Sequence, residues 1–231
     1  MSIANNINEI KSQLPKNVIL VAVSKTKPIA DLMQAYEAGQ RIFGENKIQE
    51  MTEKWETMPK DVDWHMIGHV QTNKVKFMAP YVNLIHGVES LKLLQEIDKQ
   101  AKKNNRIIDC LLQIHIAEEE TKFGLNEIEF DELIISDELK LLQNIKIIGL
   151  MGMATFIENR PQIKKEFEHL KAIFDKTRTT EFTNFKLQTL SMGMSGDYPL
   201  AIECGSTMVR IGSSIFGVRS PLTPKGGNLN L

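Results

Sequence analysis

The feature that most constrains this chain is a series of eight short apolar runs separated by segments with helical periodicity. Most of the runs are continuously apolar rather than alternating, which is typical of parallel strands that are covered on both faces. The predicted strands are residues 18–24, 41–43, 63–67, 82–87, 107–116, 145–151, 186–190 and 208–211.

Helical segments lie between these strands. Residues 29–38, 90–103 and 161–177 place apolar side chains at intervals of three and four, and residues 3–14 predict an extra helix before the first strand. With 231 residues, the chain has about 29 residues per strand–helix repeat, which matches one closed (β/α)8 TIM-type barrel. An open doubly wound sheet is the alternative, but it often carries a glycine-rich turn after its first strand, and none follows residues 18–24. We therefore expect one barrel domain over residues 1–220 and a flexible tail over residues 221–231.

Composition excludes several classes of function. The formal net charge is −1, so no overall field draws the chain to nucleic acid or to an anionic membrane. No apolar run approaches the roughly 20 residues that span a bilayer, and the first residues lack a signal-peptide pattern, so we expect a cytoplasmic protein. Cys110 and Cys204 are expected to be buried and reduced, and they have no zinc-type spacing. Nothing in the pattern suggests a large symmetric interface, so we expect a monomer.

Active residues of a barrel sit at the carboxyl ends of its strands and in the loops that follow. Lys25 stands at the end of the first predicted strand, where partial burial would favour the neutral amine that attacks an aldehyde. A solvated loop lysine is the plain alternative, and Lys27 competes for the same role. Arg210 lies inside the last predicted strand and needs either a ligand or a structural ion pair.

Two loops rich in glycine and serine follow the seventh and eighth predicted strands, at residues 191–196 and 212–214. In this fold these two loops commonly form a phosphate cradle, although either loop alone could be an ordinary turn. Histidines give a weaker signal: His65 and His69 are four residues apart but run from a strand into a loop, so we predict no metal site.

Six segments in order carry a resemblance over nearly the whole chain: residues 22–28, 43–46, 65–74, 149–151, 190–197 and 205–212. Through them the sequence resembles the pyridoxal phosphate homeostasis protein family, whose fold is similar to the N-terminal barrel of alanine racemase. The resemblance implies that the chain binds pyridoxal 5′-phosphate (PLP) as a Schiff base on Lys25, with Arg210 near the pyridine nitrogen. It implies further cofactor-binding positions at Ser191, Gly212 and Ser213 for the phosphate, and at Asn46 and Met192 for the pocket lining.

PLP can serve catalysis or be carried. An arginine beside the pyridine nitrogen weakens the ring as an electron sink. In alanine racemase the second base is a tyrosine from a separate C-terminal domain, which the 231 residues are too few to include, although Tyr198 stays a candidate. We therefore expect a PLP carrier or buffer without catalytic residues, which exchanges PLP with PLP-dependent apo-enzymes. A weak PLP-dependent amino-acid racemase that uses Lys25 with Tyr198 or water is the alternative. A third possibility is a barrel that binds another phosphate, in which Lys25 acts only through its charge.

Overall fold

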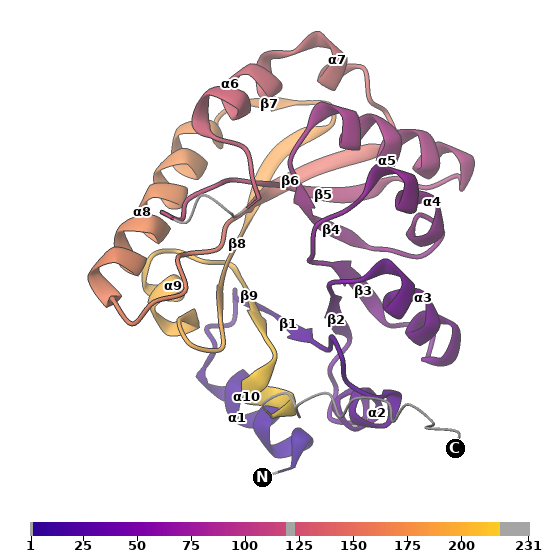
Figure 1. Cartoon of the computed structure of the whole chain (residues 1–231), viewed down its shortest axis with the longest axis vertical. Helices are drawn as coiled ribbons and strands as arrows, with labels where there is room; N and C mark the ends of the chain where they lie inside the picture. The colour runs from indigo at the N-terminus through magenta and orange to yellow at the C-terminus, as the bar shows by residue number, and fades with distance from the viewer. Residues whose placement is uncertain (1, 119–122, 218–231) are drawn as a thin grey trace, which may run out of the picture.

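The computed structural model describes residues 2–118 and 123–217 and shows eight parallel strands closed into a barrel and surrounded by helices (Figure 1). Neighbouring strands pair in chain order, and β9 closes the ring against β1 with Ile19 opposite Met208 and Val21 opposite Arg210. The predicted (β/α)8 barrel is therefore confirmed. The barrel strands are β1 (Ile19–Val23), β2 (Ile42–Glu45), β3 (Asp63–Met66), β4 (Leu84–Val88), β5 (Ile108–Gln113), β6 (Ile145–Met151), β8 (Phe185–Met194) and β9 (Met208–Ile211).

Two features of the strands differ from the prediction. A two-residue strand, β7 (Glu181–Phe182), pairs antiparallel with the start of β8 and is too short to leave a periodic signal. Strand β8 also continues to Met194, past the predicted end at residue 190, because Ser191 still pairs with Met208 and accepts a hydrogen bond from the Gly152 amide at 3.1 Å. Part of the predicted loop 191–196 is therefore strand.

The extra helix before the first strand is confirmed as α1 (Ile3–Gln13), and the Asn6 side-chain amide donates a hydrogen bond to the Ile215 carbonyl at 2.9 Å. Ser90 begins α5 as expected, since its hydroxyl accepts a hydrogen bond from the Leu93 amide. The remaining helices are α2 (Ile29–Glu37), α3 (Ile48–Thr57), the 3-10 turn η1 (Thr72–Lys74), α4 (Val75–Met78), α5 (Leu91–Lys103), α6 (Glu127–Ile135), α7 (Asp137–Lys140), α8 (Arg160–Thr177), α9 (Tyr198–Glu203) and α10 (Ser213–Phe216). Within residues 2–118 and 123–217, none of these helices has the length and apolar character needed to cross a bilayer.

The strands are buried on both faces, which explains their continuous apolar sequences. A large core lies between the strands and the helices, and a small cluster fills the barrel interior, made of Val21, Leu84, Leu111, Met151 and Met208. Side chains two residues further along a strand point to the same face, so His86 follows Leu84 and Arg210 follows Met208 on the interior side. The barrel interior therefore changes from apolar to polar toward the carboxyl ends of the strands.

Both cysteines are free and buried, as expected. Burial raises the pKa of the Cys110 thiol far above its usual value, with the neighbouring Asp109 adding to the shift. Cys110 is therefore a protonated core side chain rather than a nucleophile.

Candidate functional site

Lys25 lies in a tight turn directly after β1 and is half-buried. The turn is closed by a hydrogen bond from the Lys27 amide to the Ser24 carbonyl at 3.0 Å, and Thr26 has a positive φ of 65°. Ser24 is fully buried, and its hydroxyl donates to Glu45 Oε1 at 2.6 Å on the helix side of the barrel. Extended two residues past the end of β1, the alternation of strand side chains would put Lys25 on the interior side, on which Val21 lies.

Lys27 is the other lysine of this turn, and its amine is already engaged. Its Nζ donates to the carbonyl oxygens of Phe216 at 2.8 Å and Gly217 at 3.1 Å, at the end of α10. The sequence alone left Lys25 and Lys27 in competition; this contact gives Lys27 a structural task that ties the first loop to the last helix.

Arg210 lies in the barrel interior with 4% of its surface exposed. Its guanidinium donates to the Ser191 carbonyl at 2.9 Å, the Ser191 hydroxyl at 2.6 Å and the Gly152 carbonyl at 3.0 Å. Burial lowers the pKa of Arg210 to about 10, so the side chain keeps its charge at neutral pH. These three hydrogen-bond partners are neutral oxygens, and the Asp197 carboxylate acts on Arg210 through its charge, opposing the lowering of its pKa.

A pair of buried histidines continues this network. His86 Nδ1 lies 3.2 Å from the Ser191 hydroxyl, and His86 Nε2 lies 3.1 Å from His65 Nδ1. Burial lowers the pKa of His65 to about 3, and burial together with the charges of His65 and Arg210 lowers the pKa of His86 well below 6.5. Both rings are therefore neutral, and Arg210 carries the permanent charge of this network. His69, by contrast, lies at the rim, where its Nδ1 is 3.1 Å from Glu89 Oε1.

The loops after β8 and β9 meet at the start of α10. Gly212 precedes this helix, and its amide donates to the Ser195 hydroxyl oxygen at 3.2 Å; the Ser214 amide approaches the same oxygen at 3.5 Å. Ser213 and Ser214 are exposed, whereas Ser191 is fully buried. Of the three residues predicted for the phosphate, Gly212 and Ser213 lie at this helix start, and Ser191 lies at Arg210.

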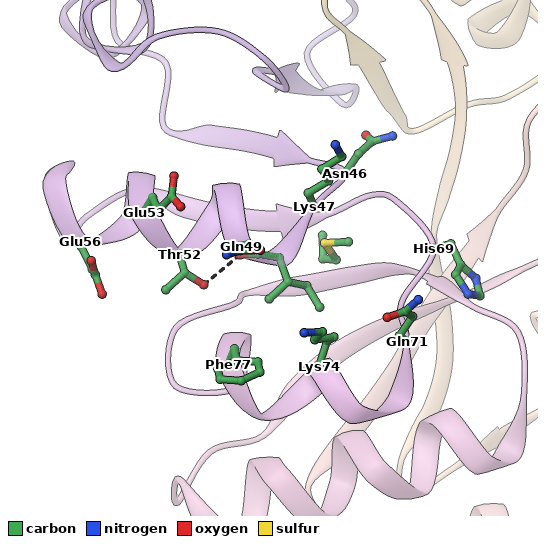
Figure 2. A pocket seen from close by; sticks show the side chains of 12 residues that line it. Asn46, Lys47, Gln49, Thr52, Glu53, Glu56, His69, Gln71, Lys74 and Phe77 are labelled. Atoms are coloured by element: carbon green, nitrogen blue, oxygen red, sulfur yellow. Dashed lines mark hydrogen bonds between the residues drawn. The ribbon is translucent and has the colours of Figure 1, made fainter. Parts of the chain in front are cut away.

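The two residues predicted to line the pocket also differ in their surroundings. Met192 is fully buried in the core between the strands and the helices. Asn46 follows β2, and its Oδ1 is buried without a hydrogen-bond partner among the described residues. Asn46 also borders a cavity of about 510 Å³ between α3 and α4; Figure 2 shows the Asn46 amide pointing away from Lys74 and Phe77 on the opposite wall.

Sequence reasoning about single residues missed Ser195 and Lys54. Ser195 lies in the serine–glycine segment that was singled out, but nothing in the sequence distinguished it from Ser191. Lys54 was missed because its partners come from other parts of the chain: it is 5% exposed, and its Nζ donates to Glu45 Oε1 at 2.7 Å. The helical spacing of the apolar residues in α3 carries no signal for such a buried lysine. His86 was expected to be a core or rim histidine, and only its contacts with Ser191 and His65 could not be predicted.

Comparison with known proteins gives consistent matches over the whole barrel. The family described as "Alanine racemase, N-terminal domain" matches residues 1–220. A pyridoxal phosphate homeostasis protein from Aquifex aeolicus is 40% identical over 202 residues, which cover 87% of this chain and 86% of the relative. Another, from Haemophilus influenzae, is 35% identical and covers 95% of this chain and 97% of its own length.

Among solved structures, PipY of Synechococcus elongatus with PLP bound has a TM-score of 0.84 and 34% identity, covering 94% of this chain and all of PipY. An alanine racemase from Clostridium difficile has a TM-score of 0.74 at 16% identity, and this chain spans 57% of it. This second likeness concerns the fold alone.

Proposed function

Because this chain belongs to the pyridoxal phosphate homeostasis protein family, whose barrel is the alanine racemase N-terminal domain, we propose that it binds PLP as a Schiff base on Lys25 and carries it within the cell. The observation that carries the assignment to Lys25 is the turn after β1. Lys25 lies in this turn at the carboxyl end of β1, and the Lys27 amine supports the assignment because it already holds the Phe216 and Gly217 carbonyls of the last helix.

The residues around Lys25 suit this cofactor in chemical type. The Asn46 Oδ1 is a buried acceptor without a partner among the described residues, so a polar group of a ligand would satisfy it. A Cβ at Gly212 would lie 3.1 Å from the Val23 carbonyl oxygen, so the absence of a side chain there keeps the backbone of two neighbouring strands in close approach. Arg210 is a donor that stays charged, and an unprotonated pyridine nitrogen can accept a hydrogen bond from such a donor.

For the phosphate, we place the amides of Gly212 and Ser214 together with the hydroxyls of Ser195 and Ser213. The two amides already converge on the Ser195 oxygen, which is the arrangement of donors that an anion needs. Ser191 suits this task less well, because its hydroxyl is fully buried and is shared between Arg210 and His86. In our proposal Ser191 holds Arg210 in place rather than contacting the phosphate.

The hydrogen bonding of Tyr198 and the charge of Arg210 favour carriage of PLP over catalysis. Bound PLP supplies an aldehyde that condenses with amines and a ring that withdraws electrons from them. Tyr198, the second base of the racemase alternative, donates its hydroxyl proton to Gln13 Oε1 at 3.0 Å, and so is tied to α1. Arg210 stays protonated at neutral pH and so cannot remove a proton from a substrate, and the Tyr198 hydroxyl is engaged with α1.

The test is an absorbance spectrum after addition of PLP, followed by borohydride reduction and peptide mass mapping. We expect a visible band and a reduced adduct on Lys25. Lys25→Ala should lose the band with its fold intact, and Lys27→Ala should keep both band and adduct. An adduct on Lys27 or on any other lysine would refute the assignment, and a colourless protein without adduct would favour a barrel for another phosphate.

The racemase alternative is tested by exchange of the α-hydrogen of alanine and serine in D₂O. Exchange that is rapid in the wild type and lost in Lys25→Ala would overturn the carrier proposal. We further propose that the carrier is a cytoplasmic monomer and that PLP-dependent apo-enzymes receive the cofactor. Light scattering measures whether the protein is a monomer. Reactivation of an apo-enzyme, with and without a dialysis membrane between the two proteins, measures whether the cofactor is transferred and whether transfer needs contact.

A further inference from the structure

A buried ion cluster lies directly beneath the turn that carries Lys25. Lys54 of α3 directs its Nζ to three oxygens: the Ser24 carbonyl at 2.8 Å, Glu45 Oε1 at 2.7 Å and Glu50 Oε1 at 2.7 Å. The side chains of Lys54 and Glu45 are 6% and 0% exposed. An ammonium has three donors, so all of them are used within this cluster.

The cluster holds the backbone on both sides of Lys25. On one side, Ser24 donates its hydroxyl to Glu45 at 2.6 Å and accepts from Lys54 at its carbonyl. On the other side, the Thr26 amide donates to Glu50 Oε1 at 2.6 Å. Lys25 therefore lies between two residues that are each fixed by a charged partner.

The strained conformation of Thr26 indicates that the ion cluster does more than close the turn. Its φ of 65° lies in the left-handed region, which is an outlier for a β-branched residue and is energetically unfavourable. A strained backbone conformation persists only where surrounding contacts hold it in place. The Glu50 carboxylate provides such a contact, because it accepts a charge-assisted hydrogen bond from the Thr26 amide.

We infer that Glu50, Lys54 and Glu45 are positioning residues for Lys25: they hold the turn so that the Lys25 amine faces the barrel mouth before a ligand arrives. The effect of this positioning on PLP binding rests on the function proposed above, whereas its effect on the reactivity of the Lys25 amine does not. Preorganisation of this kind raises the rate at which a nucleophile reaches its target. A merely structural cluster would stabilise the fold and leave the reactivity of Lys25 unchanged.

The variant that separates these roles is Glu50→Ala, because Glu50 lies at the edge of the cluster with 23% of its side chain exposed. Glu50→Gln keeps an oxygen acceptor for the Thr26 amide and serves as the conservative rescue. Glu53→Ala, an exposed glutamate on the same helix, is the matched control. Thermal unfolding of all three variants shows whether each one folds.

Two readouts report on Lys25. The first uses no cofactor: reductive methylation with formaldehyde, in which the labelling rate of Lys25 is compared with that of the exposed Lys92 by peptide mass mapping. The second is the rate of appearance and the visible circular dichroism of the band formed with PLP. We expect Glu50→Ala to lower the labelling rate of Lys25 by at least about tenfold and to slow the formation of the visible band by at least about tenfold. The circular dichroism of the band at saturating PLP should also be weaker. Glu50→Gln and Glu53→Ala should stay within about twofold of the wild type.

The two proposals fail in different ways. A wild type without any band refutes the proposed function, and the labelling rates still decide the positioning role. A folded Glu50→Ala variant that labels Lys25 at the wild-type rate overturns the positioning role, whether or not PLP binds. If Glu50→Ala does not fold, Glu50→Asp replaces it in both readouts, because its shorter side chain withdraws the carboxylate from the Thr26 amide. Loss of Thr26 amide protection in folded Glu50→Asp without any change at Lys25 would then overturn the inference.

Discussion

The buried pair of His65 and His86 makes the folding stability of this chain depend on pH. Burial lowers the pKa of His65 from 6.5 to about 3, and it lowers the pKa of His86 well below 6.5. Below pH 6.5 the unfolded chain therefore binds a proton at each histidine while the folded chain does not. The stability that these residues contribute is complete above pH 6.5 and is lost as the pH falls toward the folded-state pKa.

The magnitude follows from these shifts. Each histidine that is neutral only in the folded state costs about 1.4 kcal/mol per pH unit below its unfolded pKa. Between pH 7 and pH 5, His65 alone lowers the free energy of unfolding by about 2 kcal/mol, and His86 by up to a similar amount. A total loss of about 2 kcal/mol from His65 alone, and of at most about 4 kcal/mol with His86, is a large part of the roughly 5–15 kcal/mol that holds a domain folded.

Urea unfolding at about pH 7, 6 and 5 measures this loss in the wild type and in His65→Gln/His86→Gln. The double variant should lose much less than the wild type over the same range, whatever its absolute stability. His169→Gln, at an exposed position on α8, is the control and should keep the wild-type slope. Burial raises the pKa of Glu45 and so opposes the loss as the pH falls, but Glu45 is present in both proteins and cancels in the comparison.

The reasoning would be refuted by a wild type that loses less than about 1 kcal/mol between pH 7 and pH 5, or by a double variant that loses as much as the wild type.

Three further outcomes follow from the geometry. Ser195→Ala should weaken PLP retention about tenfold in an absorbance titration, because a charge-assisted hydrogen bond is lost; unchanged retention would remove Ser195 from the phosphate site. Lys54→Met should lower the free energy of unfolding by about 3–5 kcal/mol in urea, because it leaves Glu45 buried without its cation, and a loss under about 1 kcal/mol would contradict this account. Gly149→Ala should lose more than about 3 kcal/mol or fail to fold, since its Cβ would lie 1.9 Å from the Thr189 carbonyl oxygen, whereas Gly196→Ala, with nothing within 4 Å, should unfold like the wild type.

The fold was largely predictable because its signals are local. Strands β6 and β9 have the predicted bounds, Ile145–Met151 and Met208–Ile211, since each is an apolar run ended by a change of composition. The end of β8 was predicted four residues early. Serine and glycine at residues 191–193 are typical of a loop, whereas pairing with β9 keeps these residues in the sheet. Tertiary pairing overrode local composition there.

The site was predictable in its positions but not in its contacts. The rule that function lies at the carboxyl ends of barrel strands led to Lys25 and Gly212 from sequence alone. The partners of Arg210 could not be predicted, because Ser191 and Gly152 lie 19 and 58 residues away and meet it only when the barrel closes. Lys54 is the clearest case: nothing in the sequence singled it out, and its burial is possible because the Glu45 carboxylate of β2 and the Glu50 carboxylate of α3 pair with its ammonium.

Two charged networks lie on opposite sides of the strand that leads to Lys25. On the interior side, Arg210 keeps its charge while His65 and His86 are neutral, and the charge of Asp197 favours the protonated Arg210. On the helix side, Lys54 pairs with Glu45 and Glu50. Arg210 can therefore attract an anionic ligand, whereas the ion cluster contacts the residues on both sides of Lys25. It follows that changes at Arg210 should act mainly on how tightly an anion is held, and changes at Glu50 mainly on how fast Lys25 reacts.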